Sequence, residues 1–202
     1  YATKKVLNIL KSNSVFDVLN PDFVERREVS LNQTIVLKNK DNASVGIKVE
    51  VFPVPGKIAL FLEDKNKGNN FGTDPEDTVG LKIIDIKTKK YFFYIPGCAD
   101  ITDDLKKRIK KAPMILFDGT LWTDDEMLKT KVGVTKTGQR MGHMSMSGKK
   151  GTIEIFKDLD VKKKIFIHIN TTNPVLLEDS AERTKINEEG WEVSYDGMEV
   201  EL

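Results

Sequence analysis

Cysteine and histidine are the scarcest of the chemically reactive side chains in this 202-residue chain. There is one cysteine, Cys98, and there are two histidines. A single cysteine excludes an internal disulfide framework and zinc knuckles built from CxxC pairs within this sequence, and an unpaired thiol suits a reducing cytosol. We therefore expect a cytoplasmic protein. No residue near Cys98 in the sequence is a candidate base that would activate its thiol, so we expect Cys98 to be a packing residue.

A charge excess of one sign and a long apolar run are also lacking. Lys and Arg number 32 against 31 Asp and Glu, for a net charge of +1. Such a balance creates no global field toward nucleic acid or an anionic membrane, and no apolar run approaches the roughly 20 residues that span a bilayer. We expect neither partner. The length and the 39% hydrophobic content indicate one globular domain, residues 1–202.

Periodicity and turn signals predict a mixture of strands and helices. The predicted strands cover 45–51, 79–86, 91–95, 114–117, 165–169 and two short segments of 191–200 around an Asp196-Gly197 turn. The predicted helices cover 3 to about 13, 103–111 with Thr102 as N-cap, and 180–189 with Gly190 as its stop; a polar loop is predicted for 63–77. This mixture indicates a sheet covered by helices, α/β or α+β.

Two polar residues are associated with the apolar strands of the second half. Asp118 follows strand 114–117, and His168 lies within strand 165–169. Sites in open α/β sheets gather at the carboxyl ends of strands, which favours a functional role for both residues. The alternatives stay open: Asp118 as a carboxylate that caps a turn, and His168 as a satisfied core histidine.

His143 lies among small and flexible residues, in the segment MGHMS, and fits a surface loop equally well. Two histidines and one aspartate are fewer than the four ligands of a closed zinc site. The residues alone therefore leave an open metal site and no metal as equal alternatives. Asn170 to Asn173 follow the strand of His168 and are able to hydrogen-bond around a ligand.

The segment FDGTL, residues 117–121, resembles the first motif of haloacid-dehalogenase-type phosphatases. In that motif two aspartates stand one residue apart before Gly-Thr, and the first is the nucleophile. Leu116 occupies the nucleophile's position here. An apolar side chain cannot attack phosphorus, so this function is excluded. The acidic run 124–126 most simply begins a helix, since carboxylates favour its first turn.

Longer motifs carry a more specific resemblance. They are FPVPGK (52–57), DGTLWTDDEM (118–127), KTGQRMGHM (136–144), IHINTTNP (167–174), WEV (191–193) and DGME (196–199). Together they resemble the coenzyme PQQ synthesis protein B family, PqqB, of the metallo-β-lactamase superfamily. The resemblance covers essentially all 202 residues and is poorest from 58 to 69.

The resemblance implies an α+β fold, the αββα sandwich of this superfamily, with a metal site at one edge of its two sheets. It also implies that the chain corresponds to the C-terminal two thirds of the family, and that most metal ligands belong to a preceding HxHxDH-like loop. The superfamily usually has a histidine near 53–56 and a bridging aspartate near 96–98. Gly97 takes the place of that aspartate, so a single-metal site, iron or zinc, is expected in place of a dinuclear zinc centre.

The family resemblance further implies an activity in PQQ (pyrroloquinoline quinone) biosynthesis. One iron and O₂ would oxidise the tyrosine-derived ring of a crosslinked Glu-Tyr precursor. His168 would complete the metal shell, and Asp118 and His143 would handle protons. Residues expected to shape the substrate pocket are Thr120, Trp122, Asn170 and Asn173.

Three alternatives to this enzyme stay open. The first is a carrier of PQQ or its precursor, and the second is a hydrolase of the superfamily. The third is that these 202 residues form a stable but inactive fragment. PQQ or its peptide-derived precursor is the expected partner, and a homodimer is a further expectation.

Overall fold

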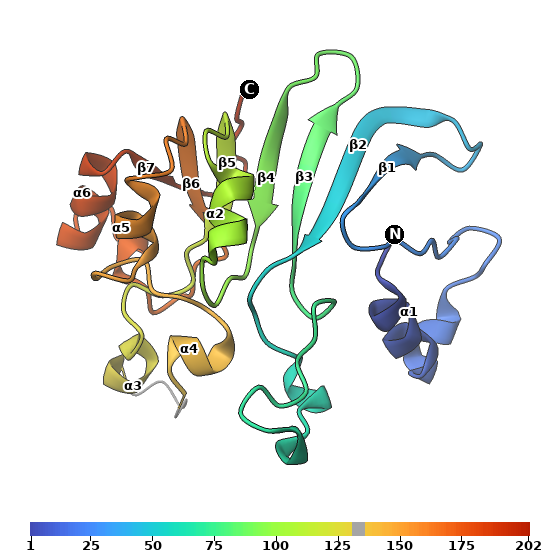
Figure 1. Ribbon diagram of the computed structural model, residues 1–202, viewed down its shortest axis with the longest axis horizontal. Helices are drawn as coiled ribbons and strands as arrows, with labels where there is room; N and C mark the ends of the chain where they lie inside the picture. Colours follow the sequence, from blue (N-terminus) through green and yellow to red (C-terminus); the bar gives the residue numbers. More distant parts are fainter. Residues whose placement is uncertain (131–135) are drawn as a thin grey trace.

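The computed structural model describes residues 1–130 and 136–202, and these residues form an α+β fold built on one mixed sheet (Figure 1). The seven strands of the described ranges follow one another across this sheet in chain order. They are β1 (Gln33–Lys38), β2 (Ser44–Pro53), β3 (Val79–Asp85), β4 (Tyr91–Ile95), β5 (Met114–Asp118), β6 (Lys163–Ile167) and β7 (Trp191–Val193).

The sheet has an antiparallel half and a parallel half that meet at β4. Strands β1 to β4 form an antiparallel meander, and β4 to β7 run parallel to one another. Parallel neighbours need crossover connections, and helices supply them. The helices are α1 (Lys4–Lys11), α2 (Asp103–Ile109), α3 (Glu126–Thr130), α4 (Gly138–Met141), α5 (Thr152–Phe156) and α6 (Ala181–Glu188), with 3₁₀ turns at Ser14–Val18, Leu60–Leu62, Lys65–Lys67 and Pro174–Leu176.

The main core lies between the parallel half and its helices. Figure 1 shows α2, α5 and α6 gathered on the β4–β7 side of the molecule. Phe93 and Phe117 of the sheet pack in one cluster with Ile109 of α2 and Phe156 of α5. The rings of Phe117 and Phe156 meet edge to face at 5.1 Å. Each such buried side chain contributes roughly 1.5–3 kcal/mol, so this cluster fixes the frame on which the strand ends sit.

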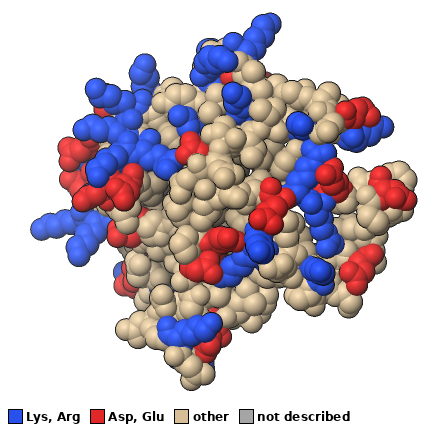
Figure 2. Space-filling view, turned by 45° about the vertical axis from the view of Figure 1, so that its right-hand side comes forward, with Lys and Arg blue, Asp and Glu red and all other residues tan. Residues whose placement is uncertain are grey.

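The antiparallel half carries a second and smaller cluster. Its buried members are Val29, Val49 and Val51, with Leu81 and Ile83 partly buried against them. Within the described ranges, no helix has the length and apolar content needed to cross a bilayer. Lys and Arg side chains lie among Asp and Glu side chains over the face shown in Figure 2.

Most predicted elements are confirmed. The β3–β4 hairpin, the strand at 114 and the helices near 103 and 180 form as expected. Thr102 caps α2, since its Oγ1 accepts from the Leu105 amide at 3.3 Å. Gly190 ends α6 with a φ of 71°, a conformation that glycine adopts without steric cost.

Other predictions of local structure were wrong. β1 was missed because Ile35, Val36 and Leu37 are contiguous and so break the alternation that marks a strand. The first helix ends at Lys11, and Thr3 gives it no side-chain cap. The turn near Asp196 forms through the Met198 amide and Tyr195 carbonyl at 3.1 Å, but 198–200 contribute no strand to the described sheet.

Candidate metal centre

Three metal-ligating side chains come together at the carboxyl ends of β5 and β6. Asp118 is the last residue of β5, His168 follows the last residue of β6, and His143 lies just after α4. The pairing of Asp118 with Ile167 across the parallel ladder brings the first two side by side. One ligand atom from each of the three lies within 4.8 Å of the others.

Asp118 is the fixed point of this cluster. Its side chain is fully buried, and Oδ2 accepts from the Cys98 amide at 2.8 Å and from Nδ1 of His143 at 2.7 Å. Oδ1 accepts from the amide and the hydroxyl of Thr120 at 3.1 and 2.5 Å. Burial alone would raise the pKa of Asp118, but hydrogen bonds from His143 and His168 outweigh it and hold this pKa below its ordinary value. Asp118 is therefore an ionised carboxylate at neutral pH.

The Thr120 hydroxyl connects Asp118 to His168. Its oxygen lies 2.8 Å from Nδ1 of His168, and its single proton goes to the Asp118 carboxylate, the stronger acceptor. Nδ1 of His168 is then the donor to Thr120, which leaves Nε2 with a free lone pair. The negative charge of Asp118, whose Oδ1 lies 3.8 Å from Nδ1, raises the pKa of His168 despite partial burial.

The two imidazole rings present the same nitrogen to the protein interior. They stack with centroids 5.2 Å apart and planes 28° apart, and both Nδ1 atoms lie within about 3.1 Å of the Thr120 hydroxyl. Each Nε2 therefore lies on the side of its ring that faces away from Thr120. Metal-bound histidines characteristically have one nitrogen fixed by a protein acceptor and the other free, and this donor set fits a divalent metal.

The backbone at both histidines is shaped to hold them there. His168 has a φ of 55°, which is why β6 ends at Ile167 and His168 lies beyond the strand in which it was predicted. This conformation costs a non-glycine residue about 1 kcal/mol or more and persists where its surroundings fix it. Gly142, just before His143, has a φ of 90° and packs directly against Lys57, where a Cβ would come within 2.8 Å.

The loop after β4 forms another wall of the site. A Cβ built on Gly97 would lie 3.6 Å from Cε1 of His143, an ordinary van der Waals contact. Cys98 contributes its backbone amide to Asp118, and its thiol donates to the Asp100 carbonyl at 3.1 Å. Burial raises the pKa of this thiol to about 12, so Cys98 is an uncharged packing group.

The four predicted substrate residues lie around the turn that follows β5. Thr120 belongs to the centre itself, and Trp122 is half-buried against the main core. The Asn170 amide donates to the Thr120 carbonyl at 3.1 Å. Asn173 is 2% exposed, and its side chain donates to the Gly119 carbonyl at 3.0 Å. These contacts place both asparagines as supports of the turn that carries Thr120.

Sequence reasoning missed a buried carboxylate that joins the loops after β5 and β6. Glu126, at 5% exposure, accepts from the Trp122 amide and from the Thr172 hydroxyl, each at 2.6 Å. The sequence signal was an acidic residue at a helix start, which predicted the helix α3 but not this contact. Glu126 holds in register the two loops that carry Thr120 and His168.

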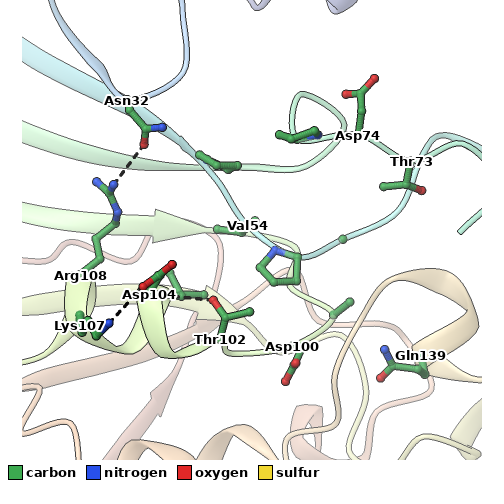
Figure 3. Close-up of a pocket in the computed structure, with 16 residues that line it drawn as sticks. Asn32, Val54, Thr73, Asp74, Asp100, Thr102, Asp104, Lys107, Arg108 and Gln139 are labelled. Carbon is green, nitrogen blue, oxygen red and sulfur yellow. Dashed lines mark hydrogen bonds and ion pairs between the residues drawn. The ribbon is translucent and has the colours of Figure 1, made fainter.

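A cavity of about 1100 Å³ lies between the end of β2, the start of α2 and residues 73–75. In Figure 3 polar groups of its walls pair with each other, Arg108 with Asn32 and Lys107 with Asp104. Its lining includes Gln139 of α4, four residues before His143, but none of the three centre residues.

Comparisons with known proteins agree on one family. Residues 1–169 match the family model described as beta-lactamase superfamily domain. Coenzyme PQQ synthesis protein B of Gluconacetobacter diazotrophicus is 46% identical over 98% of this chain and 64% of its own length. The protein of the same name from Xanthomonas euvesicatoria pv. vesicatoria is 46% identical over the whole chain and 64% of its own length.

A solved structure gives the same result in three dimensions. Zn²⁺-bound PqqB from Methylobacterium extorquens superposes with a TM-score of 0.89 at 44% identity, over all of this chain and 64% of that one. The fold predicted from the resemblance, a metallo-β-lactamase-like α+β fold, is thereby confirmed. The chain spans about two thirds, 64%, of the length of these relatives.

Proposed function

The chain belongs to the coenzyme PQQ synthesis protein B family of the beta-lactamase superfamily, and from this premise we propose that it acts in PQQ biosynthesis as a metal-dependent oxygenase. Its substrate would be the tyrosine-derived ring of a crosslinked Glu-Tyr precursor. The observation that carries the proposal is the Asp118–Thr120–His168 chain, which leaves the His168 Nε2 free.

His168 is the proposed metal ligand among the described residues, with its ring oriented by Thr120. The zinc-bound relative supports a divalent metal, and the expected single-metal site favours iron, with zinc as the other candidate. When bound, iron would supply the activation of O₂ that an oxidation requires. Proton transfer and substrate binding are assigned to side chains of this protein.

Asp118 and His143 are the proposed proton-transfer pair. The buried carboxylate fixes the His143 ring through Nδ1, which leaves Nε2 as the atom that would take up or release a proton. A carboxylate that keeps its charge in a buried site is suited to this task, since its hydrogen bonds with His143 and His168 keep its pKa low despite burial. Asp118 thus serves both histidines from one position.

The substrate pocket is proposed on the same turn. Thr120 and Trp122 would face the precursor, with the Trp122 ring as a flat apolar surface for a quinone-like ring. Asn170 and Asn173 would act on the substrate mainly through the turn that they support. The proposal also includes a cytoplasmic location, no nucleic-acid or membrane partner, and assembly as a homodimer.

A single-turnover experiment on the full-length protein tests this function. The iron-loaded protein, the crosslinked precursor, ¹⁸O₂ and a two-electron reductant such as ascorbate are mixed, and the product is analysed by mass spectrometry. The reductant is needed because hydroxylation places one oxygen atom in the ring and reduces the other to water. Incorporation of labelled oxygen that is lost in His168→Ala, together with its metal, is the expected result. Bound but unchanged precursor would favour a carrier, and hydrolysis of a lactone by the zinc-loaded protein would favour a hydrolase.

A further inference from the structure

A cluster of two cations, one carboxylate and one aromatic ring lies next to the metal centre and has no part in the roles assigned so far. Glu63 accepts from both terminal nitrogens of Arg140, at 3.1 and 2.8 Å, and also pairs with the Lys57 ammonium. The Arg140 guanidinium stacks over the Phe71 ring at 4.1 Å. We name this set the Lys57–Arg140 cluster.

Among the described residues, the cluster pairs two positive charges with one negative charge. Hydrogen bonds from Arg140 and Lys57 lower the pKa of Glu63 to about 2, so its single negative charge faces two positive ones. Glu63 and Lys57 have side chains only 8% and 13% exposed, so this excess is poorly screened by water. Glu63 also takes only three of the eight N–H donors that the two cations offer.

A depression in the surface adjoins the cluster. Lys57, Arg140 and Phe71 line a cavity of about 500 Å³ with Asn70 and Gln139. Gln139 also lines the large cavity of Figure 3, so the two hollows share a wall. A cavity that presents free, half-buried N–H donors and a positive charge is complementary to a carboxylate.

The cluster is built into the same scaffold as His143. Arg140 lies on α4, three residues before His143, and Gly142 between them packs against Lys57. The Lys57 amide donates to Thr78 Oγ1 at 3.2 Å, and a Cβ on Gly97 would touch both the Thr78 methyl group and the His143 ring. Lys57 therefore packs against the loop that carries His143.

We propose that Lys57 and Arg140 form a carboxylate-binding subsite that anchors an acidic, ring-bearing ligand beside the metal centre. The inference rests on the proposed function for the identity of that ligand, since a crosslinked Glu-Tyr precursor and PQQ both carry several carboxylates. Glu63 holds the two cations in place, and Phe71 orients the planar guanidinium. One carboxylate of the ligand accepts the N–H groups that Glu63 leaves free.

The test compares two ligands on the full-length protein. PQQ, with three carboxylates, and its trimethyl ester, which has none free, are titrated by fluorescence or calorimetry. Lys57→Met and Arg140→Met are each expected to weaken PQQ binding about tenfold or more, because each removes charge-assisted hydrogen bonds. Binding of the ester is expected to stay within twofold of the parent protein.

Lys149→Met is the matched control, since it removes one positive charge from an exposed loop that touches none of these residues. It is expected to leave both affinities unchanged, and Lys57→Arg is expected to restore most of the PQQ affinity lost in Lys57→Met. Equal weakening of PQQ and ester in the cluster variants would overturn the proposal, because it would mean that the cluster only braces the loop.

The outcomes separate this inference from the proposed function. PQQ affinity that is unchanged in both variants, or absent in the parent protein, overturns the subsite whatever the turnover assay gives. PQQ binding that depends on Lys57 and Arg140 supports the subsite even where iron and O₂ give no product, in which case the oxygenase function fails and a carrier stands.

Discussion

The parallel and antiparallel halves of the sheet contribute to the site in different ways. In the parallel half, the ends of β5 and β6 lie at one edge and deliver Asp118 and His168 directly. In the antiparallel half, successive strand ends alternate between the two edges, and only the segments after β2 and β4 reach the centre, through Lys57 and the Gly97-Cys98 turn. The parallel half therefore holds the proposed chemistry, and the antiparallel half supplies walls.

The parallel half is also more tightly packed than the antiparallel half. The parallel half is packed under helices, with Phe117, Phe166 and Trp191 almost fully buried. The small cluster of the antiparallel half has three buried valines, and its other members are only partly buried. Precise placement of the histidines requires a rigid frame, and the well-packed half provides it.

The largest expected effect concerns Cys98, where the two halves meet. With a pKa near 12 in the folded protein and about 9 when unfolded, its thiolate fraction at pH 8 falls about a thousandfold on folding. Native protein should therefore react with a thiol reagent more than a thousandfold more slowly than protein in urea. Because the unfolded thiol ionises first, Cys98 should also favour unfolding above about pH 9. Rapid labelling of the native protein would contradict the burial of this turn.

Asp118→Asn should cost about a thousandfold in turnover, within the range for loss of a general acid–base pair. The neutral amide would be a weaker acceptor than the carboxylate for Nδ1 of His143 and for the Thr120 hydroxyl. Asp85→Asn, in the exposed β3–β4 turn, is the control from the antiparallel half and should leave turnover unchanged. Steady-state kinetics measures turnover in both variants. An equal loss of turnover in both would contradict the conclusion that the parallel half holds the catalytic residues.

Phe117→Ala should lower the free energy of unfolding by about 3–5 kcal/mol, because it opens a cavity against Phe156. Leu81→Ala, on the half-exposed face of β3, should cost about 1 kcal/mol, since less apolar area is lost. Denaturant unfolding followed by circular dichroism measures both. A larger loss in Leu81→Ala would show that the small cluster, and not the helix-covered core, limits stability.

The smallest expected effect compares two threonines at helix starts. Thr102→Ala should destabilise by about 1 kcal/mol, because it removes the cap of α2. Thr3→Ala should be neutral or slightly stabilising, since Thr3 Oγ1 is buried with no hydrogen-bond partner among the described atoms. The melting temperatures of the two variants measure this difference. Equal destabilisation by Thr3→Ala and Thr102→Ala would contradict the conclusion that only Thr102 acts as a helix cap.

The sequence predicted the parallel half better than the antiparallel half, and the reason is physical. Strand 114–117 is fully apolar, and α2 carries its own cap, so both elements are marked locally. β1 lacks the alternation of apolar and polar residues that marks a strand, and it depends on pairing with β2. The sequence predicts a strand that includes His168 and ends at 169, whereas β6 ends at 167. The positive φ of His168 ends it, and contacts rather than propensity set that angle.

The site was predictable in outline but not in its connections. The rule that sites gather at carboxyl ends of strands singled out Asp118 and His168 from a single sequence. The Thr120 hydroxyl as a bridge depends on where three loops meet, which no spacing reveals. The same holds for Glu126, whose partner Thr172 is 46 residues away. It also holds for the Lys57–Arg140 cluster, in which Arg140 and Glu63 are 77 residues apart and Glu63 belongs to the loop where the family motifs agree least.

Gly97 is a position at which the site accepts an added side chain. It occupies the position at which the superfamily resemblance implies a bridging aspartate, its backbone is not in the left-handed region, and a Cβ there meets only ordinary contacts. A side chain installed at this point would therefore begin beside the His143 ring. An aspartate at position 97 would ask directly whether one further carboxylate changes the number of metal ions that the centre binds.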